Sequence, residues 1–384
     1  MTQSLIKYFI TIIICIALLS CSKPIFLKNM GSDEPGYFMF GRIPERNFYH
    51  EKAITENLEL LWNAQTHGSH SNTSFVIYND HLFIGDLSGR IYVFEKNSGK
   101  LIGYEKFNGS IDISPVLYKL RFYFVLNDRE EFYSRFIVFD FINGKILSED
   151  KIFSSVSNEL IRLEDGIAVY SDNGEIIKYN YAGIREWTTQ TKTTSLSSPC
   201  SDGVTIFCAN TKGELLFVDT KNGDIKYQEK ISDHFESGLT FDGENLFLGN
   251  NNGVLLSFHI QTKRINWLIN TGARIISTPV FDNQKIIVGN LSGNIFAVDK
   301  KSGKKLWSLK TNGIINTTPL LTKTFLIQPD LNKKLHLINP HIGAIVKSID
   351  YEGRVKLSPI IFDDILYLGS DRGQIFAYKI KNAE

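Results

Sequence analysis

Residues 277–309 read STPVFDNQKIIVGNLSGNIFAVDKKSGKKLWSL and contain four short apolar runs. The runs are STPVF, KIIVG, NIFAVD and KKLWSL, and turn-forming residues such as Asp282, Asn290 and Gly303 lie between them. Runs of about four to six residues rich in Ile, Val and Phe, bounded by such turns, are typical of β-strands. This stretch therefore predicts a small four-stranded sheet.

The same pattern recurs about every forty residues along the chain. In seven of the eight copies a glycine, or Lys333 once, precedes the third run, and in seven a second glycine, or Lys263 once, precedes the fourth run. Four strands with a period near forty predict the blades of a β-propeller, and no stretch shows a sustained helical period. The first glycines are Gly89, Gly174, Gly213, Gly253, Gly293 and Gly373, and the second are Gly99, Gly144, Gly183, Gly223, Gly303 and Gly343.

Eight copies of the unit begin near residues 70, 109, 155, 193, 233, 273, 313 and 353. The last copy ends before its fourth run, whereas ELLWNAQT at 59–66 matches KKLWSLKT at 304–311. We therefore predict an all-β fold over residues 58–384, an eight-bladed β-propeller of four-stranded blades. An N-terminal strand should close the ring, which also removes open sheet edges.

Two repeated residues have structural explanations. The second glycine is expected to adopt a positive φ in the hairpin between the third and fourth strands. Trp187, Trp267 and Trp307 each follow it by four residues, and Tyr227 fills that position in the fourth copy. A large aromatic at blade spacing predicts a wedge between neighbouring blades rather than a ligand platform.

The N-terminus reads as a targeting segment. Lys7 precedes an apolar run from Tyr8 to Leu19, and a helix of that length, about 18 Å, is too short to span a bilayer. Residues 1–20 therefore predict a signal peptide. The sequence Leu-Leu-Ser-Cys at 18–21 resembles the lipobox of bacterial lipoproteins, which implies acylation of Cys21; the alternative is a chance cysteine after an ordinary signal. Residues 21–57 are expected to be the lipid anchor and a tether.

The composition argues against several classes of protein. Lys and Arg total 42 against 41 Asp and Glu, so the chain lacks the positive surplus expected of a nucleic-acid binder. A neutral body is weakly attracted to anionic lipid, so membrane attachment must come from acyl chains. Four cysteines in 384 residues do not form a disulfide scaffold. Cys200 and Cys208 are expected to be buried in core strands, with Cys200 facing Thr205.

The signature of Gly293, Asp299, Gly303, Lys304 and Trp307 resembles the repeat of pyrroloquinoline-quinone (PQQ)-type propellers. With a lipobox and eight blades, the chain resembles the BamB family, lipoproteins of the outer-membrane β-barrel assembly (BAM) machine. The resemblance implies a non-catalytic scaffold on the periplasmic face of the outer membrane. It also implies a partner, the periplasmic domains of the barrel subunit BamA, and support for the delivery of unfolded barrel proteins.

In that family, the loops joining one blade to the next make the partner contact. The corresponding loops here are 191–198 and 231–238, and the resemblance gives Leu196, Asp233 and Glu236 as partner-binding residues. The first loop lacks the arginine of the family pattern. An insertion at 127–135 should lie on the same face as these loops.

A PQQ-dependent dehydrogenase, or another propeller that binds a quinone or small ligand, is the alternative. Such an enzyme needs a catalytic aspartate, calcium ligands and usually an adjacent cysteine pair, and no two cysteines are adjacent here. Among the eight histidines, His67 and His70 have a spacing that a metal site could use, but they lie in an expected loop with no cysteine nearby and no carboxylate between Glu59 and Asp80. We therefore assign no catalytic, cofactor-binding or metal-binding residue. A lipoprotein of another surface complex with the same fold stays open.

Overall fold

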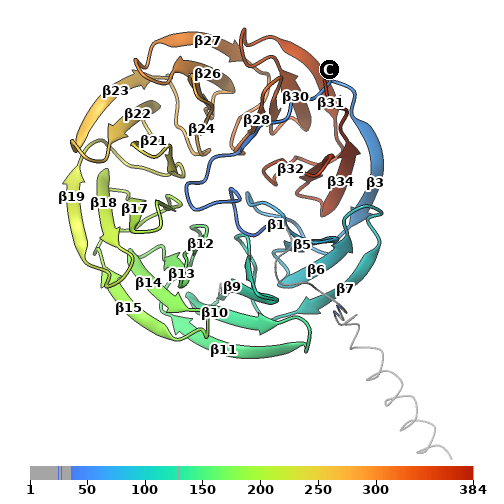
Figure 1. The fold of residues 1–384 in the computed structure, drawn as a ribbon, viewed down its shortest axis with the longest axis vertical. Helices are drawn as coiled ribbons and strands as arrows, with labels where there is room; N and C mark the ends of the chain where they lie inside the picture. Colours follow the sequence, from blue (N-terminus) through green and yellow to red (C-terminus); the bar gives the residue numbers. More distant parts are fainter. Residues whose placement is uncertain (1–24, 26, 28–35, 129, 384) are drawn as a thin grey trace, which may run out of the picture.

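The computed structural model describes residues 25, 27, 36–128 and 130–383. They form eight four-stranded antiparallel sheets arranged as a ring around a central channel (Figure 1). No helix is present among these residues, and therefore none that could cross a membrane. The predicted signal peptide 1–20 and Cys21 lie outside the described residues.

Each blade runs from an inner strand at the channel to an outer strand at the rim. Blades 1 to 4 are β4 (Val76–Tyr78), β5 (His81–Gly85), β6 (Arg90–Glu95) and β7 (Leu101–Lys106); β8 (Val116–Tyr118), β9 (Arg121–Asp128), β10 (Tyr133–Asp140) and β11 (Lys145–Ile152); β12 (Ile161–Arg162), β13 (Gly166–Tyr170), β14 (Glu175–Asn180) and β15 (Arg185–Gln190); and β16 (Cys200–Ser201), β17 (Thr205–Ala209), β18 (Glu214–Asp219) and β19 (Ile225–Lys230).

The second half of the ring repeats the plan. Blades 5 to 8 are β20 (Thr240–Phe241), β21 (Asn245–Gly249), β22 (Val254–His259) and β23 (Arg264–Asn270); β24 (Val280–Phe281), β25 (Lys285–Gly289), β26 (Asn294–Asp299) and β27 (Lys305–Lys310); β28 (Leu320–Thr322), β29 (Leu326–Pro329), β30 (Lys334–Ile338) and β31 (Ile345–Asp350); and β32 (Ile360–Phe362), β33 (Ile365–Gly369), β34 (Gln374–Lys379) and β3 (Glu59–Gln65).

The predicted closure of the ring is present. β3, from the N-terminal side of the chain, pairs antiparallel with the C-terminal β34, and Trp62 lies opposite Ala377. Blade 8 is therefore built from both ends of the chain. The first and last repeats cannot separate without breaking this sheet.

The turns behave as the repeat predicts. Gly303 and Gly343 have φ of 69° and 72°, and the two lysines that replace glycines keep the same conformation, with φ of 55° at Lys263 and 64° at Lys333. A side chain in this left-handed region costs roughly 1–2 kcal/mol, which explains why glycine fills most of these positions.

The repeated tryptophans are wedges between blades, as predicted. Trp307 of blade 6 is 8% exposed, and its indole packs against Gly343 of blade 7. Its Nε1–H donates to the carbonyl of Pro340 at 3.0 Å. A Cβ on Gly343 would lie 2.6 Å from the indole, so the glycine also makes room for the wedge.

The segment expected to be a tether is instead part of the propeller over its described residues 36–57. Residues 36–52, here called the hub segment, cross the channel inside the ring (Figure 1). Its Met39, Phe40 and Phe48 are at most 5% exposed. A tether prediction failed here because these apolar side chains have no period that would mark them as a core element.

The hub segment contacts every blade. It adds two short strands, β1 (Gly36–Tyr37) beside β4 and β2 (Tyr49–His50) beside β28, and otherwise bonds to the inner strand, or to residues next to it, of each remaining blade. The remaining contacts are Phe38 O with Leu117 N, Arg46 Nη2 with Glu159 O and Leu160 O, Pro44 O with Ser201 N, Glu45 O with Phe241 N, Asn47 with Phe281, and Lys52 Nζ with Asp363 O.

The cysteine prediction was partly wrong. Cys200 and Cys208 are buried free thiols, but Cys200 lies opposite Phe207 rather than Thr205, because the turn between β16 and β17 is centred on Gly203 and Val204, one residue later than expected. The two thiols belong to different apolar clusters. Burial raises the pKa of both thiols well above its ordinary value, so both are unreactive.

Candidate functional site

The ring has two distinct faces. Because strands alternate in direction within each blade, the loops between blades lie on the same face as the turns between second and third strands, here called the connector face. The remaining turns form the turn face. The insertion at 127–135 lies beside a connector, as predicted, since Ser110 and Asn127 pair through their backbones.

The connector face opens onto a cavity of about 230 Å³ at the end of the channel. Leu196, Glu236, Ile276 and Asn316 line it, one from each of four successive connectors. They are spaced forty residues apart, so the repeat itself places them at one ring position. The structure thus brings together two of the three predicted contact residues, Leu196 and Glu236, and leaves Leu196 43% exposed.

Glu236 is paired within the chain. Its carboxylate contacts the guanidinium of Arg274 and lies 2.8 Å from Nε2 of His234. Asn251 Nδ2 also donates to Glu236 Oε1 at 3.1 Å. Burial, and then the charge of Arg274, lower the pKa of His234, so the imidazole is neutral at physiological pH. The site therefore presents a compensated polar cluster rather than a free acidic group.

Asp233 lies apart from that mouth. It accepts a hydrogen bond from Asn252 Nδ2 at 2.8 Å and lines a separate hollow with Lys212 and Lys230. Its charge is exposed and flanked by lysines. A partner that docks over Leu196 would meet Asp233 only at the edge of the contact.

Sequence reasoning missed Arg274. The first connector lacks an arginine, but Arg274 on the connector between blades 5 and 6 sits directly against Glu236. Its side chain is 44% exposed, so it can contact both Glu236 and a ligand. The sequence did contain a signal for this pairing. Arg274 follows His234 by forty residues, so the two occupy the same position in successive connectors.

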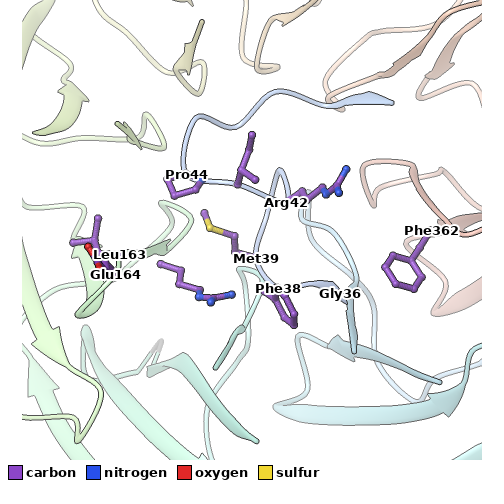
Figure 2. Close-up of a pocket in the computed structure, with 10 residues that line it drawn as sticks. Gly36, Phe38, Met39, Arg42, Pro44, Leu163, Glu164 and Phe362 are labelled. Carbon is purple, nitrogen blue, oxygen red and sulfur yellow. The ribbon is translucent and has the colours of Figure 1, made fainter. Parts of the chain in front are cut away.

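The turn face holds a larger cavity, of about 510 Å³ (Figure 2). Figure 2 shows Met39 of the hub segment between Arg42 on one side and Leu163 and Glu164 of the β12–β13 turn on the other. Arg162 also lines it, with its guanidinium carbon 4.9 Å from the ring centre of Phe38. Two guanidinium groups against the single carboxylate of Glu164, with apolar walls, suit an anion that carries an apolar part.

The hub segment separates the two mouths. Met39 lines the turn-face cavity, and the next residue, Phe40, lines the connector-face cavity. Between them Arg46 is fully buried and donates to the carbonyls of Glu159 and Leu160 at 2.7 and 2.9 Å. The channel is thus occupied by the protein's own chain.

Glu159 is the second buried charge of the channel. Its carboxylate accepts hydrogen bonds from Thr73 Oγ1 at 2.7 Å and from the Ser114 amide at 2.8 Å. Burial raises the pKa of Glu159 to about 7, although the charge of Arg46 opposes the shift. Within the described part of the chain, no group of three or more His, Cys, Asp or Glu residues could hold a metal ion.

Comparison with known proteins identifies the family. The family model described as "Outer membrane protein assembly factor BamB" matches residues 53–234 and 228–384. A curated protein of that name from Taylorella asinigenitalis is 39% identical over 62 residues, which span 16% of this chain and only 16% of the relative.

Solved structures share the fold at low identity. BamB from Moraxella catarrhalis aligns with a TM-score of 0.72 and 16% identity over 84% of this chain and 100% of that one. Quinohemoprotein alcohol dehydrogenase from Comamonas testosteroni aligns at 0.74 and 11% identity over 92% and 82%. Fold likeness alone does not separate the two, but the family model covers nearly all of the propeller. The chain belongs to the family of the outer membrane protein assembly factor BamB.

Proposed function

We propose that the protein is a non-catalytic lipoprotein scaffold of the outer-membrane β-barrel assembly machinery. In this proposal, acylation of Cys21 holds it on the periplasmic face of the outer membrane. Its connector face binds the periplasmic domains of a BamA-type subunit and so aids insertion of barrel proteins. The observation that supports this most is the match of the family model along the whole propeller.

The site's geometry supports a docking role. The exposed Leu196 lies at the connector-face mouth, and the cluster of Glu236, Arg274 and His234 lies at the neighbouring connector. A partly exposed arginine beside an exposed apolar side chain suits a protein-binding hot spot, where arginine is enriched. The occupied channel leaves the outer surfaces for recognition, which also favours a scaffold over an enzyme.

Affinity capture of the lipidated protein from its own detergent-solubilised envelope tests the proposal. We expect recovery of a BamA-type barrel subunit, identified by mass spectrometry. Leu196→Asp should weaken the capture by at least about tenfold, because a buried unpaired carboxylate destabilises the contact. Ile184→Asp is the matched control, since Ile184 is also exposed but lies on the turn face. No barrel subunit, or equal loss in both variants, contradicts the proposal.

A propeller that binds an anionic quinone or similar small ligand is the second candidate. Two observations favour it: the fold shared with quinohemoprotein alcohol dehydrogenase, and the turn-face cavity with its two arginines. Organic extraction and absorption spectroscopy of protein purified from its own envelope test it. A quinone chromophore released in proportion to protein, and lost in Arg162→Ala, would establish this function instead.

A further inference from the structure

Two described residues near the predicted lipid site are packed within the propeller. Ile25 and Leu27 are 1% and 5% exposed and belong to the apolar cluster shared by blades 1 and 2. The Ile25 amide donates to Glu105 Oε1 at 3.2 Å. Glu105 lies on β7, the outermost strand of blade 1. The chain thus reaches the rim of the ring four residues after Cys21.

Chain length then limits where the bilayer can be. Four residues span at most about 14 Å when fully extended. A compact body of this size has a radius of gyration of about 20 Å, so that reach is shorter than the radius of the ring. If Cys21 is acylated, the bilayer surface must come within about 14 Å of the rim of blades 1 and 2. The opposite rim, at blades 5 and 6, is out of reach.

The rim of blade 2 has the surface that such a position requires. Phe132 in the β9–β10 turn and Phe153 directly after β11, both 77% exposed, lie where the rim of blade 2 meets the connector face, and Ile146 and Leu147 on the outer strand β11 are 46% and 47% exposed. Lys151 Nζ lies 3.5 Å from the ring centre of Tyr133 on the same blade. No other exposed large apolar side chain among the described residues is aromatic. Exposed phenylalanines beside lysines suit a membrane interface.

We propose that the rim of blade 2 rests on the outer-membrane surface, so that the propeller stands on its edge. The proposal rests on the proposed acylation of Cys21. An edge-on ring leaves the connector face and the turn face both open to the periplasm. The connector-face mouth can then meet a partner beside the anchor rather than beneath the lipid.

Lipid quenching at opposite rims tests the orientation. Leu147 of blade 2 and Leu306 of blade 6 occupy the same repeat position, are 47% and 50% exposed, and lie on opposite sides of the ring. Each is changed singly to cysteine in the full lipidated protein and labelled with a fluorophore. Cys200 and Cys208, both fully buried, do not compete for the label. The protein is reconstituted in phosphatidylethanolamine–phosphatidylglycerol vesicles that contain a nitroxide-labelled lipid.

We expect quenching several-fold stronger at position 147 than at 306. A Gly/Ser spacer of about 20 residues after Pro24, with a span of roughly 25 Å, should remove the difference while the protein still floats with the vesicles. The double variant Phe132→Ser and Phe153→Ser should reduce the difference in quenching between positions 147 and 306. If the protein floats with the vesicles but quenching is equal at both positions, the edge-on orientation is wrong and the lipid anchor is retained. Protein that does not float, with Cys21 unmodified by mass spectrometry, overturns the lipid anchor as well, whereas BamA capture tests the partner independently.

Discussion

The ring and the hub segment are built on opposite principles. In the ring most blades repeat the same turns and aromatic wedges, and most contacts join neighbours in sequence. The hub segment, residues 36–52, has no repeat, and its contacts reach as far as Lys52 with Asp363. Local, periodic pairing makes the blades, whereas a few long-range contacts, at least one with each of the eight blades, hold the hub segment in the channel. The two regions should therefore respond differently to substitution.

The largest expected effect is in the hub segment. Arg46→Ala removes a fully buried guanidinium and leaves the carbonyls of Glu159 and Leu160 unsatisfied. We expect the free energy of unfolding to fall by about 3–5 kcal/mol, measured by denaturant titration. Arg42→Ala, at an exposed position of the same segment, should change it by less than about 0.5 kcal/mol. Equal small effects would mean that the hub segment does not stabilise the ring.

The next effect is a pH dependence. Burial raises the pKa of Glu159 from its ordinary 4.5 to about 7, so the folded state binds a proton that the unfolded state releases between these values. Protonated Glu159 therefore contributes on the order of 3 kcal/mol to the free energy of unfolding. This contribution is fully present below about pH 4.5 and is lost as the pH rises through about 7. Glu159→Gln should flatten the thermal stability profile in this window. An unchanged profile would show that another group is responsible.

A smaller effect is expected at a ring wedge. Trp307→Phe keeps an aromatic ring but loses the hydrogen bond to the Pro340 carbonyl. The free energy of unfolding should fall by about 2 kcal/mol, because that carbonyl becomes unsatisfied. Tyr227→Phe at the same repeat position should cost less, since the hydroxyl bonds only to Glu229 on the outer strand. A larger loss at Tyr227 would contradict the wedge account.

The smallest expected effect is a gain. Lys333 is exposed and keeps a φ of 64° at a position that holds glycine in most blades. Lys333→Gly should raise the free energy of unfolding by up to about 1 kcal/mol, because relief of the left-handed strain slightly exceeds the entropy cost of glycine. Lys301→Gly, in a turn without that conformation, is the control and should not stabilise the protein.

The predictable part of the molecule is the part that repeats. The blade count, the closing strand with Trp62 and the positive φ of the turn glycines all follow from one forty-residue pattern. The same pattern placed Leu196 and Glu236 at one mouth, although the pairing with Arg274 required the distances between connectors.

The hub segment was missed because its partners lie one per blade across the whole chain. Sequence spacing says nothing about such contacts. The only local sign is the density of aromatic residues from Tyr37 to Tyr49, which is high for a tether. The predicted strand partner of Cys200 was wrong for a related reason. Moving that partner by two residues, from Thr205 to Phe207, keeps the same side chains on the same face of the sheet, so the apolar pattern does not distinguish the two registers.

Hydrogen–deuterium exchange of residues 36–52 tests most directly whether the channel is closed by the protein's own chain. If the hub segment is part of the fold, its amides and those of Ser201, Phe241 and Leu321, which bond to its carbonyls, should exchange as slowly as the blade interiors. Exchange of the segment at the rate of an unstructured tether, with the blades still protected, would contradict this. It would mean an open channel, free to take a ligand.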